Sequence, residues 1–199
     1  MSDFWNERYA TEGWAYGTDP NDFLAEVEPR LTRGRVLCLA DGQGRNGVFL
    51  AERGHSVMSM DQSKVGLECA RKLAAERGVT IETRLGDLNE FAIEPVAWDT
   101  IVLIFVHLPA ELRARVARGV VHGLKPGGMF VLEVYAPDQM GRGTGGPSSP
   151  VDYASLAELQ ATYLGLEWII ARELERNVLE GKLHSGKSAV VQMLGRKPA

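Results

Sequence analysis

The chain has few cysteines, no long apolar run and no excess of positive charge, and each shortage excludes a class of protein. Its 199 residues include 2 cysteines, Cys38 and Cys69, which are not spaced as Cys-x-x-Cys, so we expect neither a disulfide framework nor a metal site. The longest apolar run, residues 101–106, is far too short to cross a bilayer. A formal net charge of −4 argues against a nucleic-acid partner. Because the first residues are polar and lack a signal-peptide core, we expect a cytoplasmic protein that does not bind membranes.

One stretch organises the rest of the chain. Residues 36–40 are apolar and predict a buried strand, which leads through a turn containing Gly42, Gly44 and Gly47 into a helix. Glycines let the backbone approach a ligand closely, and the free N–H groups of a helix N-terminus point at its polar end. Asp61 closes the next apolar run, where a carboxylate can accept hydrogen bonds from two ribose hydroxyls. The pattern predicts an adenosine-containing cofactor; the alternative is a glycine-rich turn without a ligand.

Strands and helices alternate along most of the chain. Asp19 as N-cap and Pro20 at the first helical position predict the start of a helix, and Lys125-Pro-Gly-Gly128 predicts a turn. We expect strands at 36–40, 57–60, 79–83, 100–106, 129–135, 166–178 and 187–195, and helices at 3–10, 20–27, 48–54, 63–78, 109–124 and 156–164. This order predicts an α/β fold of the doubly wound, Rossmann-like type, with a mostly parallel sheet covered by helices on both faces. The last two strands, with no helix between them, predict an antiparallel C-terminal hairpin at the sheet edge.

We expect a single domain over residues 1–199. Within it, residues 1–30 would form an N-terminal helical lid, 31–136 the cofactor-binding core, 137–150 a mobile loop and 151–199 the C-terminal helix and hairpin. The leader is rich in aromatic residues, which suits either a lid over a pocket or an apolar flap packed on the sheet.

Several short motifs resemble one enzyme family. They are Trp5-Asn-Glu-Arg-Tyr9 with Tyr16-Gly17, Gly42-Gln-Gly-Arg-Asn46, Asp61, Gly86-Asp87, Leu124-Lys-Pro-Gly-Gly128, Gly143-Thr-Gly-Gly-Pro147 and Glu180-Gly-x-x-His184-x-Gly186. Together they resemble the class I S-adenosylmethionine-dependent methyltransferases, and more narrowly the small bacterial branch that includes the tellurite-resistance methyltransferases. The resemblance implies a seven-stranded sheet whose last strand is antiparallel, and S-adenosylmethionine (SAM) as cofactor. The chain departs from the family at Cys38 and Ala40, where an acidic residue and the first glycine usually stand; Asp41 is the candidate substitute for the carboxylate.

The resemblance also implies roles for individual residues. Those assigned to the cofactor are Ala40, Asp41, Gly42 and Gly44 at its methionine and ribose part, Asp61 at the ribose hydroxyls, Gln62 beside the adenine, Asp87 and the backbone N–H of Leu88 at the adenine edge, Phe105 and Val106 beside the sulfonium, and Tyr16 from the leader. The carboxyl edge of the strands is also where an open α/β sheet binds its ligand.

Three side chains are candidates for catalysis. His107 follows the strand at the ligand edge and would act as a base or orient the acceptor, unless it is a turn histidine bonded to backbone. Arg45 stands in the first turn of a helix, an unfavourable place for a cation, so it would hold an anionic substrate or the cofactor carboxylate rather than face solvent. His184, near the hairpin tip, is either a substrate contact or part of the turn. Glu133 is expected to point inward and pair with a cation.

Methyl transfer from a sulfonium is an in-line displacement that depends chiefly on alignment of nucleophile, methyl group and sulfur. An ionised sulfur, selenium or tellurium nucleophile needs no base, whereas a hydroxyl or an amine benefits from one. We therefore expect a small-molecule acceptor, with such soft nucleophiles among the candidates, and a monomer or homodimer. Two other functions stay open: an NAD-dependent oxidoreductase, from the literal Gly42-x-Gly44-x-x-Gly47, and a non-catalytic binder, from Cys38 and Ala40.

Overall fold

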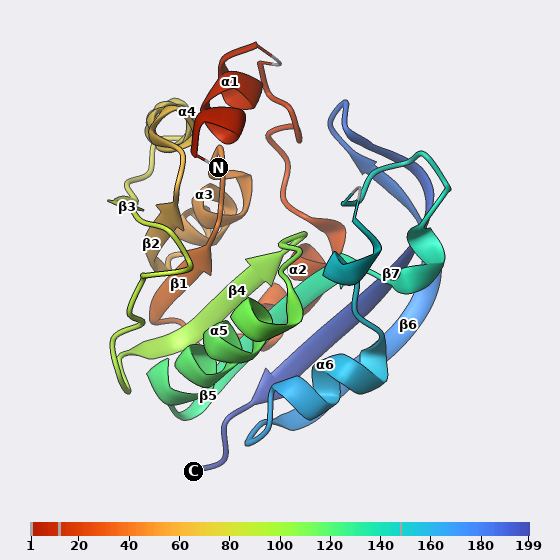
Figure 1. The fold of residues 1–199 in the computed structure, drawn as a ribbon. Coiled ribbons are helices and arrows are strands. Elements are labelled where there is room, and N and C mark those ends of the chain that lie inside the picture. The colour runs from red at the N-terminus through yellow and green to blue at the C-terminus, as the bar shows by residue number, and fades with distance from the viewer. Residues whose placement is uncertain (1, 12, 148) are drawn as a thin grey trace.

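The computed structural model describes residues 2–11, 13–147 and 149–199, which build one sheet of seven strands in the order β3-β2-β1-β4-β5-β7-β6 (Figure 1). The strands are β1 (Arg35–Leu39), β2 (Ser56–Asp61), β3 (Glu82–Leu85), β4 (Trp98–Ile104), β5 (Leu124–Tyr135), β6 (Glu167–Glu180) and β7 (His184–Arg196). β1 to β5 pair in parallel, while β7 runs antiparallel to both β5 and β6. The predicted mostly parallel sheet with an antiparallel C-terminal hairpin is confirmed.

Helices cover both faces of this sheet, as predicted. They are α1 (Ser2–Thr11), α2 (Asp22–Val27), α3 (Arg45–Glu52), α4 (Lys64–Glu76), α5 (Ala110–Gly123) and α6 (Leu156–Thr162). Alternate residues of a strand point to opposite faces. Leu37 of β1 therefore packs in the core under α5 and α6, whereas Val36 packs in the core under α2 and α3. Figure 1 shows α5 and α6 in front of the sheet and α2 behind it.

From β1 the chain adds β2 and β3 on one side of the sheet, and β4 then pairs with β1 on its other side. The direction of strand addition therefore reverses between β1 and β4. A crevice opens at such a switch point, outside the carboxyl ends of the strands. The glycine-rich turn between β1 and α3 therefore lies at the place where the sheet itself favours a ligand. No helix among residues 2–11, 13–147 and 149–199 is long and apolar enough to cross a membrane.

Several predicted boundaries differ from the structure, among them the starts of α3 and β7, and three differences have a clear physical reason. The second helix is capped by Asn21, not Asp19, because the Asn21 side chain accepts the Leu24 N–H at 2.9 Å. β3 begins at Glu82 instead of residue 79, since its partners on β2 are residues 58–61. Residues 125–128 form no separate turn: they make a bulge inside β5, between Leu124 opposite Trp98 and Met129 opposite Thr100.

Candidate active site

A single large cavity gathers the predicted site residues at the carboxyl edge of the sheet. Its volume is about 1130 Å³, which exceeds the common size of a small-molecule pocket and leaves room for a cofactor and a second molecule. The predicted residues that line it are Tyr16, Ala40, Asp41, Gly42, Arg45, Asp61, Gln62, Asp87, Leu88, Phe105, Val106, His107 and His184. Gly44 does not line the cavity. It packs against α4 instead, where a side chain would collide with Ala70. Its glycine serves helix packing and the left-handed backbone at the start of α3, not the cavity.

Two residues at the cavity hold strained backbone. Ala40, directly after β1, has φ +50°, and Phe105, directly after β4, has φ +53°. The left-handed region costs a residue with a side chain about 1–2 kcal/mol. Strain of this kind persists where surrounding structure holds it, often at ligand sites. The Phe105 N–H is held by the Glu133 carbonyl oxygen at 2.7 Å.

Asp61 ties the glycine turn to the end of β2. It is 4 % exposed; its Oδ2 accepts the Gly42 N–H at 2.8 Å and its Oδ1 accepts the Ser63 N–H at 2.7 Å. Burial raises the pKa of this carboxyl, while the backbone hydrogen bonds oppose the shift. Helix α3 begins at Arg45, and its N-cap Gly44 has no side chain to cap it. Asp41 accepts the N–H of Gly47, so the N–H groups of Arg45 and Asn46 are the ones that a ligand could engage.

Asp41 fastens the other side of the same turn. Its Oδ2 accepts the Ser59 hydroxyl at 2.5 Å and the Gly47 N–H at 3.2 Å, which joins β2 to the first turn of α3. Burial raises the pKa of Asp41 to about 7. The half-buried Asp87 differs, because the backbone and side-chain N–H groups of Asn89 hold its pKa below the usual range.

Both histidines stand in an aromatic wall. The His184 ring centroid lies 4.6 Å from those of Tyr16 and Phe105, and the His107 ring stacks on Tyr135 at 5.6 Å. The pKa of each histidine is lowered to about 3, chiefly by burial, and nearby guanidinium groups contribute to the shift of His184. Both rings are therefore neutral at pH 7. His107 Nε2 and His184 Nδ1 are buried without a hydrogen-bond partner among the residues that the structure describes.

Arg45 does not offer a free cation. Its Nη2 pairs with Glu180 at the end of β6, and its Nη1 donates to the carbonyl oxygen of Asp19 at 3.2 Å. A role of Arg45 toward an anionic substrate or the cofactor carboxylate stays a prediction, and in this structure the guanidinium is paired with the buried Glu180.

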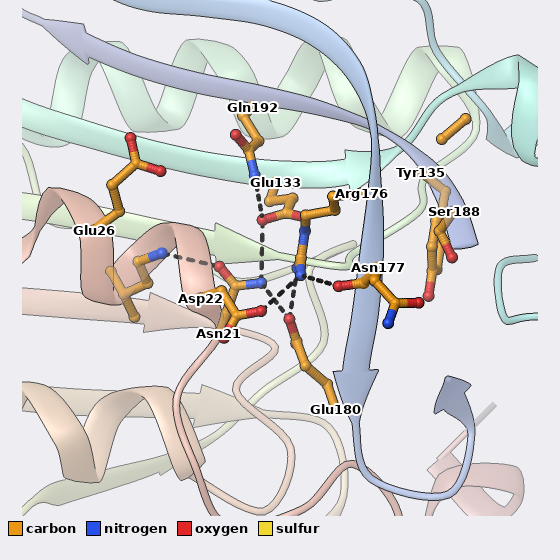
Figure 2. Close-up of polar contacts among 12 residues, drawn as sticks. Asn21, Asp22, Glu26, Glu133, Tyr135, Arg176, Asn177, Glu180, Ser188 and Gln192 are labelled. Atoms are coloured by element: carbon orange, nitrogen blue, oxygen red, sulfur yellow. Dashed lines mark hydrogen bonds and ion pairs between the residues drawn. The ribbon is translucent and has the colours of Figure 1, made fainter. Parts of the chain in front are cut away.

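Glu180 belongs to a buried polar cluster that the sequence showed only in part (Figure 2). Arg176 donates from Nε to Glu133 at 2.7 Å and from Nη2 to Glu180 at 2.6 Å. Asn21 donates to both carboxylates, at 3.1 and 3.0 Å. The prediction that Glu133 points inward and pairs with a cation is confirmed. No feature of the sequence identified Arg176 on β6 as the partner of Glu133.

Comparisons with known proteins agree with this geometry. Residues 36–128 match the family model described as a methyltransferase domain. Over 167 residues the chain is 28% identical to the 2-heptyl-1-hydroxyquinolin-4(1H)-one methyltransferase of Mycobacteroides abscessus, with 82% of this chain and 73% of that protein covered. The methyltransferase domain and the similarity to a methyltransferase over most of the chain support a class I SAM-dependent methyltransferase.

Solved structures share the fold of this methyltransferase. TehB from Haemophilus influenzae superposes with a TM-score of 0.73 at 21% identity, covering 98% of this chain and 66% of that one. A structure from work on the conversion of a disulfide bond into a thioacetal group during echinomycin biosynthesis has a TM-score of 0.79 at 18% identity, covering 100% and 92%. The domain match and these neighbours imply SAM as the cofactor, and they give no support to the nicotinamide alternative.

Proposed function

We propose that the enzyme methylates a flat, largely apolar small molecule whose acceptor O–H or S–H group gives up its proton easily. The observation that carries the proposal is the wall of Phe105, Tyr135, His107 and His184, in which both histidines are neutral. Aromatic faces favour stacking of a planar ring. A histidine whose pKa lies near 3 is a weak base at neutral pH, so the acceptor must ionise readily itself.

We assign the cofactor to the side of the cavity formed by the glycine turn. Asp61 would accept hydrogen bonds from the ribose hydroxyls, and Asp87 with the Leu88 N–H would hold the adenine edge beside Gln62. When bound, SAM supplies an electrophilic methyl group on a sulfonium; this methyl passes in line to the acceptor atom and leaves S-adenosylhomocysteine (SAH). Phe105, at the end of β4, would lie next to the reacting centre.

The acceptor would lie against the aromatic wall. His107 and His184 both line the cavity, and each would hold the hydroxyl or thiol group of the acceptor through a ring nitrogen that reaches the cavity, since a neutral imidazole nitrogen can donate or accept one hydrogen bond. We further propose that the leader and the loop 137–150 exclude water, because Tyr16 and residues 145–147 line the cavity. Residues 1 and 12 of the predicted lid, and residue 148 of the loop, lie outside the described residues.

A soft sulfur, selenium or tellurium nucleophile is the second candidate acceptor. The low basicity of His107 and His184 favours such an acceptor too, because an ionised nucleophile needs no base. The paired state of Arg45 removes the predicted anchor for a small inorganic oxyanion, whereas Arg8, Arg115 and Arg118 also line the cavity.

The test is an acceptor panel with purified enzyme and SAM, in which SAH release is measured. The panel holds 2-heptyl-1-hydroxyquinolin-4(1H)-one, which the relative's name specifies, together with thiophenol, selenite and tellurite. We expect turnover of the two ring compounds and little of the two oxyanions. Turnover of the oxyanions alone would contradict the proposal.

A further inference from the structure

The polar side chains of the cofactor turn are bound to the segments that cover the cavity. Gln43, which is 5 % exposed, accepts the Ala15 N–H at 2.9 Å and donates to the Gly13 carbonyl oxygen at 2.5 Å. Asn46, which is 6 % exposed, accepts the Asn21 N–H at 2.9 Å. Two side chains of the turn thus hold the leader at both ends of residues 13–21.

The third polar side chain of the turn holds the C-terminal hairpin. Arg45 pairs with Glu180, the last residue of β6, which also accepts from Arg176 and Asn21 within the buried cluster (Figure 2). Arg45 and Glu180 are 8% and 3% exposed, so water screens their attraction little. Since Glu180 directly precedes the hairpin turn, this ion pair fixes where that turn emerges from the sheet.

The leader and the hairpin turn then meet each other. The Lys182 N–H donates to the carbonyl oxygen of Ala15 at 3.1 Å, and the backbone of Gly181 packs so closely on Tyr16 that no side chain would fit. Directly beyond this contact, the rings of Tyr16 and His184 meet in the acceptor wall, with centroids 4.6 Å apart. One face of the acceptor pocket is thus built by two segments, and both are held by side chains of the cofactor turn.

We propose that Gln43, Arg45 and Glu180 are positioning residues that couple the cofactor turn to the Tyr16–His184 face of the acceptor pocket. A ligand that engages the backbone N–H groups of the turn restricts its motion, and these side chains pass the restriction on to the leader and the hairpin. Cofactor binding then orders the acceptor pocket before the acceptor arrives. The inference rests on the proposed cofactor site.

The experiment is hydrogen exchange of the full chain with and without saturating SAH, followed at residues 13–18 and 181–186. In the wild type, SAH should slow exchange at 181–186 by about five- to 150-fold, the range typical of coupled sites. Two variants break the connection without adding bulk: Gln43→Met removes the amide, and Glu180→Gln removes the charge that Arg45 pairs with. In both, SAH should still bind by calorimetry but should protect 181–186 much less.

Matched controls separate coupling from loss of stability. Gln160→Met on α6 and Glu167→Gln at the exposed start of β6 make the same chemical changes away from the turn. Both should keep the full SAH-dependent protection at 181–186. A merely structural role of Gln43 or Glu180 would lower the melting temperature and leave the ratio of exchange with and without SAH unchanged.

Two outcomes overturn the inference, and only one of them also rules out the proposed cofactor site. If SAH binds but protects 181–186 equally in the wild type, Gln43→Met and Glu180→Gln, or in none of them, the coupling is wrong and the cofactor site stands. If SAH does not bind the wild type at all, the cofactor site is wrong and the coupling with it. Should Glu180→Gln fail to fold, Gln43→Met alone decides.

Discussion

Asp61→Asn should weaken SAH binding strongly while preserving the shape of the side chain. In the free protein both carboxylate oxygens accept a backbone N–H, from Gly42 and Ser63. The amide keeps one accepting oxygen, so one contact to the turn or to the ribose is lost. A hydrogen bond to a charged group contributes ~1.5–3 kcal/mol, which predicts a dissociation constant raised roughly 10- to 150-fold.

Calorimetric titration with SAH measures this change, and Asp99→Asn is the matched control. Asp99 accepts from the Arg35 N–H and from Lys125 at the opposite edge of the sheet, so its substitution removes a similar charge far from the cavity. An SAH analogue lacking both ribose hydroxyls completes a thermodynamic cycle: the wild type should bind it weakly, and Asp61→Asn should lose little more. A change within about twofold for Asp61→Asn with SAH, below the value of one hydrogen bond, would refute the assignment.

Four further substitutions test other parts of the structure. Burial raises the pKa of Asp41 to about 7, so its protonated form stabilises the fold at low pH, and this contribution is lost as the pH rises through 7. The melting temperature should therefore fall more from about pH 5 to about pH 8 in the wild type than in Asp41→Asn. Parallel curves of melting temperature against pH would count against this. Arg176→Met leaves the buried Glu133 carboxylate without its ion-pair partner. It should lower the free energy of unfolding by about 3–5 kcal/mol, or the melting temperature by roughly 6–20 °C. A loss below about 2 °C would mean that the charge finds another partner. Gly181→Ala, at φ +74° against the leader, should speed up hydrogen exchange of residues 13–18, and unchanged exchange would show that the contact is dispensable. Ala40→Gly should relieve the left-handed backbone and raise the free energy of unfolding by about 0.5–1 kcal/mol in a urea titration; a decrease would contradict the strain at this residue.

The order of strands and helices could be predicted because each element carries its own periodic signal. Ser63, for example, is of a residue type that favours helix N-caps, and it caps α4 by accepting the Gly66 N–H at 3.0 Å. The edge of the sheet that holds the cavity followed from the same order, since parallel strands end together. Nearly all of the predicted cofactor residues therefore lie around one cavity.

The partners of buried charges could not be predicted. Arg45 and Glu180 lie 135 positions apart, and no local pattern joins a helix start to the end of a C-terminal strand. The helix start was misplaced for a similar reason. Asp19 and Asn21 are both good capping residues, and only Asn21 is also held by Asn46 and Glu133 in the folded chain.

The role of Ala40 was equally hidden, because a sequence shows the residue but not its backbone angle. At φ +50° this position suits glycine, so the alanine is a strained residue in the turn to which we assign the cofactor. Asp41, the candidate substitute for the carboxylate missing at Cys38, bonds Gly47 of the turn and Ser59 of β2.

The most direct measurement of the central claim is a parallel calorimetric titration of the wild type with SAM, SAH and NADH. We predict micromolar binding of both sulfur ligands at one site per chain and no binding of NADH. Binding of NADH without either sulfur ligand would contradict the assignment of the cavity to SAM.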